Sequence, residues 1–190
     1  MCLQQEGSRM IRWIVVGLVG LVGCVTAEPP QDFGSIPLRN PTAPFASQTN
    51  VTASELAGDW AVRRQAGAAF GGRETLAITV DAGAIGLPVP VIQCSDAADL
   101  CESVERRVDF AATGPGRWGV AEPGAGVTGP SEVWVLWADT SRRTVVLGDP
   151  DGSYVLILDR APSGGADRLT AAAEIMDWYG YDLTRLEPGQ

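Results

Sequence analysis

Residues 131–160 read SEVWVLWAD, TSRR, TVVL, GDPDG and SYVLILDR, which is three β-rich runs separated by two polar turn clusters. This order predicts an antiparallel meander of three strands. The runs are apolar at nearly every position instead of alternating with polar residues, so both faces of these strands should be covered. One face would line an interior, and the other face needs a cover.

The residues that follow the meander can supply this cover. Asp167 can cap a helix that runs from about Arg168 to Trp178, and Gly180 can stop it. The apolar residues of this segment that recur at helical spacing are Leu169, Ala172, Ile175 and Met176. A short strand is predicted over residues 181–186. The sequence therefore predicts one helix on the outside of the meander and a last strand after it.

The upstream part of the chain adds further strands. They are predicted over residues 60–65, 73–81, 88–93, 104–111 and 116–121, with glycines in the loops between them. With the meander this makes eight strands, the number at which the interior of a barrel holds side chains or one small ligand. The predicted fold is all-β: an eight-stranded antiparallel up-and-down barrel over residues 54–190, with one C-terminal helix packed outside and a short final strand.

Several short words of the sequence resemble the bacterial lipocalin family, in particular its outer-membrane lipoproteins. VVLGDP, YVLILDRAP and GYDLTRL in the last third are similar to the end of those proteins, and LAGDW at 56–60 resembles the Gly-x-Trp of their first strand. The resemblance covers residues 54–187. It implies that Gly58 and Trp60 open the first strand, and that Arg160 lies across Trp60 and closes the barrel floor.

The N-terminus is expected to be a lipoprotein signal. Arg9 and Arg12 precede an apolar run over 13–23 that is too short to span a membrane as a helix. The LVGC word at 21–24 resembles a bacterial lipobox, which implies cleavage before Cys24 and attachment of acyl chains such as palmitate to it. Val25 is not the aspartate that often signals inner-membrane retention, so we expect the periplasmic face of a Gram-negative outer membrane. The alternative is an ordinary secretory signal with a chance cysteine.

Residues 24–53 read as a flexible, proline-rich tether. The segment holds five prolines among Gln, Ser, Thr and Asn and shows no sustained period. Phe33, Ile36, Leu38 and Phe45 are more apolar than a spacer requires. Part of the tether could therefore pack across the mouth or the floor of the barrel.

Charge excludes one class of partner. Without the signal, 12 arginines stand against 22 carboxylates, a net charge of −10, so nucleic acid is not an expected partner. The chain has neither lysine nor histidine, which removes the commonest general base and the commonest metal ligand. We find no nucleophile with a base, no phosphate loop and no cluster of metal ligands. We therefore expect no enzyme activity, metal or cofactor.

Two cysteines remain once Cys24 carries its lipid. Cys94 and Cys101 are separated by six residues in an exported chain, so a disulfide that pins a strand connection is the favoured interpretation. A metal or redox site is the rival one.

Alternation along the strands suggests which side chains face the barrel interior. Adjacent arginines stand at Arg63-Arg64 and at Arg106-Arg107, so one of each pair should point inward if the strand is regular. Counting from an inward Trp60 selects Arg64. Trp134 and Trp137 should face opposite ways by the same argument. The candidate ligand-lining residues are Arg64, Trp118, Trp134 and Tyr154, although an ion pair for the arginine and core packing for the aromatic residues are the plainer alternatives.

The sequence favours a membrane-tethered barrel that holds a small hydrophobic molecule, such as a fatty acid or lysophospholipid, and that could form a homodimer. Two other classes stay open. One is a periplasmic protease inhibitor with a lipocalin-like barrel, a group whose barrels lack the C-terminal helix. The other is a structural protein of the cell envelope with a filled core.

Overall fold

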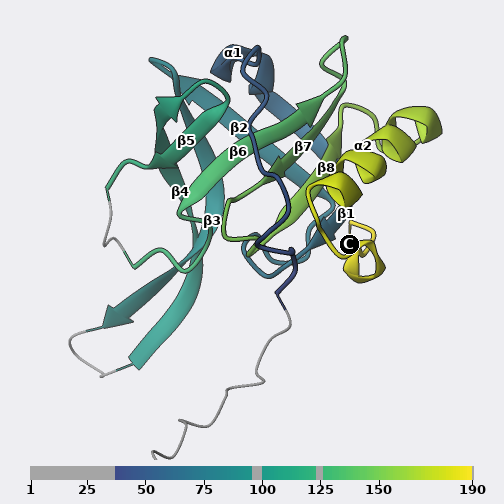
Figure 1. Cartoon of the computed structure of the whole chain (residues 1–190). Coiled ribbons are helices and arrows are strands. Elements are labelled where there is room, and N and C mark those ends of the chain that lie inside the picture. The colour runs from purple at the N-terminus through teal and green to yellow at the C-terminus, as the bar shows by residue number, and fades with distance from the viewer. Residues whose placement is uncertain (1–36, 96–99, 123–125, 190) are drawn as a thin grey trace, which may run out of the picture. The chain divides into compact units, whose positions relative to one another are not determined.

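A computed structural model describes residues 37–95, 100–122 and 126–189, and the predicted signal and Cys24 lie outside these ranges. Eight antiparallel strands close into a barrel in the order in which they follow along the chain (Figure 1). The strands are β1 (Gly58–Ala66), β2 (Thr75–Asp81), β3 (Ala84–Ser95), β4 (Leu100–Gly114), β5 (Arg117–Val120), β6 (Glu132–Ala138), β7 (Thr144–Gly148) and β8 (Val155–Asp159). The pairing of β8 with β1 closes the sheet. The predicted barrel is confirmed.

The interior of the barrel is filled by side chains from every strand. Its largest fully buried residues include Trp60, Phe110 and Tyr154. We call this set the interior core. Its strand members are Trp60, Val62, Leu76, Ile78, Ile85, Leu87, Val89, Val91, Phe110, Trp118, Val133, Val135, Ala138, Val145, Leu147, Leu156 and Leu158.

A second apolar cluster lies on the outside of β6, β7 and β8, and we call it the outer core. All five residues of β7 and all five of β8 are buried, as the uninterrupted apolar runs predict. This cluster is covered by α2 (Ala166–Trp178) and by part of residues 37–53, which precede the barrel in the chain (Figure 1). Ala172 and Met176 of α2 are fully buried in this cluster. The outside helix is confirmed.

The ends of α2 differ in part from the prediction. Gly165 precedes the helix with φ of +70° and there is no side-chain cap, so Asp167 lies inside the first turn instead of capping it. Gly180, with φ of +84°, follows the helix as expected. Within the described residues, neither α2 nor any other helix is both long and apolar enough to span a membrane.

The predicted last strand is wrong. A 3₁₀ helix, η1 (Leu183–Arg185), takes its place, and only isolated bridges from Tyr181 to Arg39 and from Glu187 to Gln65 flank it. The carboxylate of Asp182 accepts hydrogen bonds from the backbone N–H and the hydroxyl of Thr184. Such local bonding favours a turn over an extended strand.

The predicted tether is too long at its C-terminal end, because residues 37–53 pack on the barrel. Leu38 and Val51 are buried. The ring of Phe45 lies 5.2 Å from that of Trp134 and 5.6 Å from that of Tyr179. The short helix α1 (Ala53–Leu56) then leads into β1. This segment covers the outside of the barrel wall over much of its course, a place that the sequence did not suggest.

Candidate functional site

One end of the barrel is closed by the stacked pair that the resemblance implied. The guanidinium carbon of Arg160 lies 3.6 Å from the ring centroid of Trp60. Arg160 also donates to the carbonyls of Glu55, Ala57 and Asp59, at 2.9, 2.9 and 3.1 Å. Gly58 has φ of +101°, and a Cβ there would come within 3.2 Å of the arginine. This floor joins α1, β1 and the end of β8.

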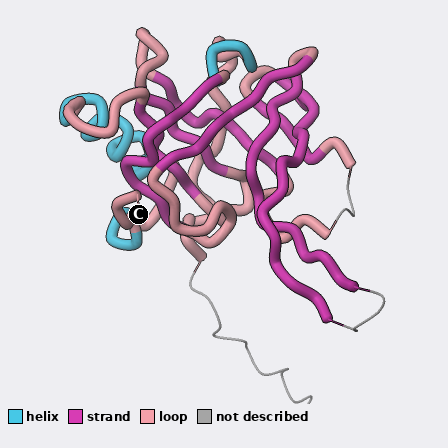
Figure 2. Tube along the Cα trace, turned by 180° about the vertical axis from the view of Figure 1, so that it is seen from behind, coloured by secondary structure: helices cyan, strands magenta, loops and turns pink. Residues whose placement is uncertain are grey.

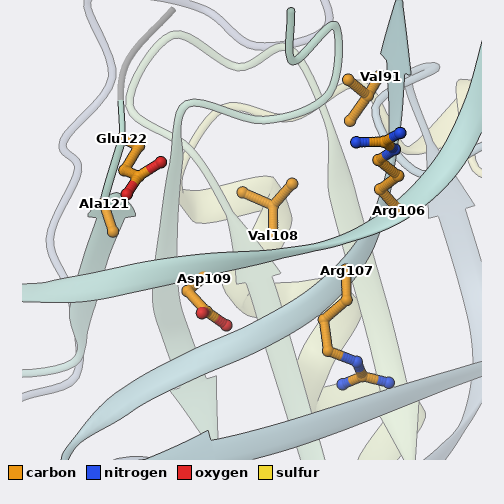
Figure 3. Close-up of a pocket in the computed structure, with 7 residues that line it drawn as sticks. All are labelled: Val91, Arg106, Arg107, Val108, Asp109, Ala121 and Glu122. Carbon is orange, nitrogen blue, oxygen red and sulfur yellow. The ribbon is translucent and has the colours of Figure 1, made fainter. Parts of the chain in front are cut away.

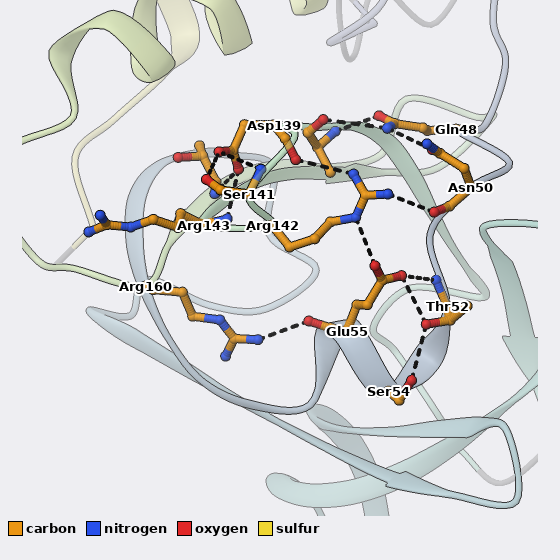
Figure 4. A network of polar contacts seen from close by, with 12 residues as sticks. Gln48, Asn50, Thr52, Ser54, Glu55, Asp139, Ser141, Arg142, Arg143 and Arg160 are labelled. Carbon is orange, nitrogen blue, oxygen red and sulfur yellow. Dashed lines mark hydrogen bonds and ion pairs between the residues drawn. The ribbon is translucent and has the colours of Figure 1, made fainter.

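A polar network braces the same end from outside (Figure 4). The carboxylate of Glu55 accepts from the backbone N–H and the hydroxyl of Thr52, and these bonds hold the pKa of Glu55 below its ordinary value. Arg142, in the turn between β6 and β7, donates to Glu55 at 3.1 Å and to the carbonyl of Asn50 at 2.7 Å. The floor is therefore a fixed structural element, not an opening for a ligand.

Arg64 does not face the barrel interior, so the prediction that it points inward, toward a ligand there, is wrong. The pairing of β1 with β8 shifts between Val62 and Arg64, which is a β-bulge. Val62 lies opposite Leu158 of the interior core, whereas Arg64 lies opposite Ile157 of the outer core. The extra residue reverses the alternation, and Arg64 is exposed. Its neighbour Gln65 is buried instead, opposite Leu156.

The prediction that Trp134 and Trp137 of β6 face opposite ways is wrong, because β6 contains a second bulge. The pairing of β6 with β7 shifts between Val135 and Trp137. Trp134 and Trp137 consequently both belong to the outer core, on the same side of the sheet. Trp134 is held there by Phe45 and by Arg117, whose guanidinium carbon lies 4.9 Å from its ring centroid. The predicted place of Trp134 on the wall of the barrel interior is therefore wrong.

Trp118 and Tyr154 do face the interior, where both are packed and hydrogen-bonded. Trp118 donates to the carbonyl of Gly83 at 3.0 Å. The hydroxyl of Tyr154 donates to the carbonyls of Glu132 and Gly148, and burial raises its pKa well above the ordinary value. These contacts make both residues part of the core, which was the plainer alternative.

The other end of the barrel, its mouth, is covered by a strap that we define as residues 126–130. The N–H of Ile92 donates to the carbonyl of Gly126, and the N–H of Thr128 donates to that of Pro90. A bridge pairs Val91 with Val127 between these bonds. Beneath the mouth, the ring of Phe70 meets that of Tyr154 edge to face at 5.1 Å. The strap thus attaches to the edge of β3 that faces away from β4.

Two clefts adjoin at this bridge, and both are open to solvent. One, of about 540 Å³, lies along the strap. Its lining residues are Gly119, Val120, Gly126, Val127, Gly129, Ser131 and Glu132. The second, of about 280 Å³, lies beside β4, and Figure 3 shows Arg106 near Val91 while Arg107 points to the other side of the strand. Val120 and Val127 are half-buried against the interior core. The larger cleft therefore extends the apolar surface of the interior core outward.

The register makes Arg106 the interior-face arginine of its pair. Arg106 lies opposite Val89 of the interior core, whereas Arg107 lies opposite Pro88. Arg106 is exposed and donates to the side chain of Gln93 at 2.7 Å. Alternation thus holds for β4, which pairs with β3 without a bulge along this stretch. The strap residues were not predicted, and the sequence offers only the short segment Gly-Val-Thr-Gly at 126–129 as a signal for them.

The predicted disulfide is confirmed. Cys94 and Cys101 are bonded, with 4.0 Å between their Cα atoms, and they lie opposite each other in the pairing of β3 and β4. The two strands extend beyond the rest of the barrel as a ribbon (Figures 1 and 2). The bond therefore clamps the outer part of this ribbon.

Comparisons with known proteins bear on the fold. No family model matches the chain, and no curated protein matches its sequence. Among solved structures, that of the major allergen Per a 4 from cockroaches is similar, with a TM-score of 0.51 and 13% sequence identity over 80% of this chain and 96% of that chain. Such a likeness shows the fold alone. This chain has a lipocalin-like fold: a closed eight-stranded antiparallel barrel with a C-terminal helix outside.

Proposed function

We propose that this protein is a membrane-tethered binding protein that holds a small hydrophobic molecule, such as a fatty acid or lysophospholipid, at the mouth of its barrel. The observation that carries the proposal is the cleft of about 540 Å³ along the strap, at the mouth of a barrel whose other end is sealed. That volume lies in the range of small-molecule sites. The proposed activity is binding, without catalysis.

The chemistry of the cleft suits an apolar chain. Val120 and Val127 offer methyl groups that are already half-buried against the interior core, so a ligand would extend that core. Each methylene that leaves water contributes about 0.8 kcal/mol. Ser131 and Glu132 lie at the same cleft and offer polar atoms. The head group of the ligand would remain in solvent at the mouth.

The test is a titration of the purified chain with fatty acids and lysophospholipids of increasing length, by displacement of a fluorescent fatty acid. We expect affinity to rise with chain length and to fall for Val127→Ser. Val80→Ser is the matched control, because Val80 is also half-buried against the interior core but does not line the cleft. Absence of saturable binding, or equal losses in both variants, would refute the proposed site.

The tether is the second part of the proposal. A lipid on Cys24 would hold the barrel at the outer membrane, for storage or transport of the ligand or for maintenance of the envelope. We expect the native chain to fractionate with membranes and Cys24→Ala to be released. Since the chain has no lysine, a fully acylated form has no primary amine and should resist amine-reactive dye.

One observation favours a second candidate, a structural protein of the envelope. Trp60, Phe110 and Tyr154 fill the barrel interior and are 0–1% exposed. Native mass spectrometry of the protein purified with its membrane separates the candidates, because a binding protein should carry a co-purifying lipid. The protease-inhibitor alternative is not proposed, since α2 is an integral part of the outer core.

A further inference from the structure

The ribbon formed by β3 and β4 has two edges of different character. Pairing of the two strands continues from Ile85 opposite Phe110 to Ser95 opposite Leu100. Pairing of β3 with β2 stops at Gly86, and pairing of β4 with β5 begins only at Phe110. Both outer edges of the ribbon thus lie beyond the neighbouring strands of the barrel.

The edge of β3 is protected against further pairing. Pro88 and Pro90 lie opposite Arg107 and Glu105. Proline has no N–H, so these two positions offer no donor at the outer edge. The strap occupies the next positions, with bonds at Pro90 and Ile92. Prolines and covering segments are recognised means by which proteins block an edge strand.

The edge of β4 is open. Ala121 donates to the carbonyl of Asp109, which shows that the backbone groups of Asp109 point away from β3. Because orientation alternates along a strand, those of Arg107, Glu105 and Ser103 point the same way. Among the described residues, none provides a strand partner for these groups. The smaller cleft lies beside this edge at Arg106 and Arg107.

We propose that the open edge of β4 pairs antiparallel with the same edge of a second copy of this chain, about a twofold axis at Val104. In this register Ser103 of one copy lies opposite Glu105 of the other, and both present their N–H and C=O groups to the partner strand. The two β4 strands would join two barrels through one continuous sheet. This inference does not rest on the proposed ligand.

Charge favours this register, because among twofolds at Ser103, Val104, Glu105 and Arg106 only the one at Val104 forms ion pairs between the strands without also placing like charges opposite each other. A twofold at Val104 places Glu102 of each copy opposite Arg106 of the other, on one face of the sheet, so two ion pairs form. A twofold at Glu105 or at Arg106 would instead place like charges directly opposite each other, which is unfavourable. At the centre, Val104 of one copy lies opposite Val104 of the other, at the close spacing of a residue pair without backbone hydrogen bonds.

The ribbon is already held in the form that pairing needs. The disulfide clamps its outer part, and Arg73 forms an ion pair with Glu105 at 2.9 Å. Arg107 donates to the hydroxyl of Thr79 at 2.6 Å and to the carbonyl of Gly86 at 3.3 Å. These contacts fix β4 against β2, β3 and the loop that precedes β2, on the face opposite Glu102 and Arg106. Little further ordering of the strand would be required on association.

The test measures self-association of the full chain in mild detergent by sedimentation equilibrium. We expect a dimer that Glu102→Arg or Arg106→Glu each weakens at least about tenfold, because each change turns both attractive pairs into repulsive ones. An equimolar mixture of the two variants should associate again, since arginines in one copy then face glutamates in the other. Arg143→Glu, on an exposed arginine at the closed end, is the control and should leave association unchanged.

Three results would overturn the proposal. A chain that is monomeric at all accessible concentrations has no such interface. If neither charge reversal weakens the dimer, or if the mixture of variants does not restore association, then the dimer contact does not lie at the edge of β4. A monomer whose Ser103, Glu105 and Arg107 amides respond in NMR spectra to an added extended peptide would show that the edge recognises a foreign strand.

Discussion

Replacing Arg160 by alanine should lower the free energy of unfolding by about 2 to 3 kcal/mol. The cation–π contact with Trp60 contributes about 0.5 to 2 kcal/mol. The bonds to the carbonyls of Glu55, Ala57 and Asp59 contribute on the order of 1 kcal/mol each, and less in sum because one guanidinium makes them all. Water can reach the freed carbonyls because Arg160 is exposed, which limits the loss.

The measurement is urea unfolding followed by tryptophan fluorescence, with thermal unfolding as a second readout. For a domain of this size the expected loss corresponds to a fall in Tm of roughly 4 to 12 °C. Arg143→Ala is the matched control: its arginine also lies at the closed end, and Figure 4 shows its side chain directed away from Glu55 and Arg160. We expect that control to change stability by less than about 0.5 kcal/mol.

Arg160→Lys separates charge from geometry. A lysine keeps the positive charge, but its ammonium cannot lie flat on the indole while it reaches three carbonyls. Its stability should therefore fall between those of the native chain and the alanine variant. Equal stability of Arg160→Ala and Arg143→Ala would refute the view that the stacked pair holds the floor together.

Three further predictions concern two buried carboxylates and the ribbon. Burial raises the pKa of Asp159, but hydrogen bonds from Thr144, the N–H of Ala161 and Arg168 outweigh it and leave that pKa below the ordinary value. The ionised carboxylate of Asp159 therefore stabilises the fold above about pH 4, and this stabilisation is lost as pH falls through the folded-state pKa. The difference in the free energy of unfolding between the native chain and Asp159→Asn should narrow in acid for that reason. Burial raises the pKa of Asp149 instead, so protonation of Asp149 should increase stability as pH falls from neutral toward about pH 4. Asp149→Asn should abolish this gain. Urea unfolding across a pH series checks the predictions for Asp159 and Asp149. Replacing Cys94 and Cys101 by serine should increase hydrogen exchange in the ribbon and leave exchange in β7 and β8 unchanged, because the disulfide clamps only the outer part of the ribbon. Equal increases in exchange throughout the barrel would contradict this prediction.

The sequence by itself determined the strand count and the outside helix. Three apolar runs between turn clusters required strands covered on both faces, and β6, β7 and β8 lie where those runs predicted. The helix followed from residues at helical spacing with Gly180 after them. The disulfide followed from Cys94 and Cys101, and the floor from the resemblance that included Trp60 and Arg160. These features depend on local pattern or on short motifs.

Tertiary structure alone decided which side chains face the interior. A bulge at Arg63 sends Arg64 outward and Gln65 inward, and another at Leu136 places Trp134 and Trp137 on the same side. One extra residue reverses every later position of a strand, and nothing in the composition of either strand marks it. Arg106 obeyed simple alternation because its stretch of β4 pairs without a bulge. A bulge depends on the fit of two strands that are distant in sequence, so alternation within one strand cannot reveal it.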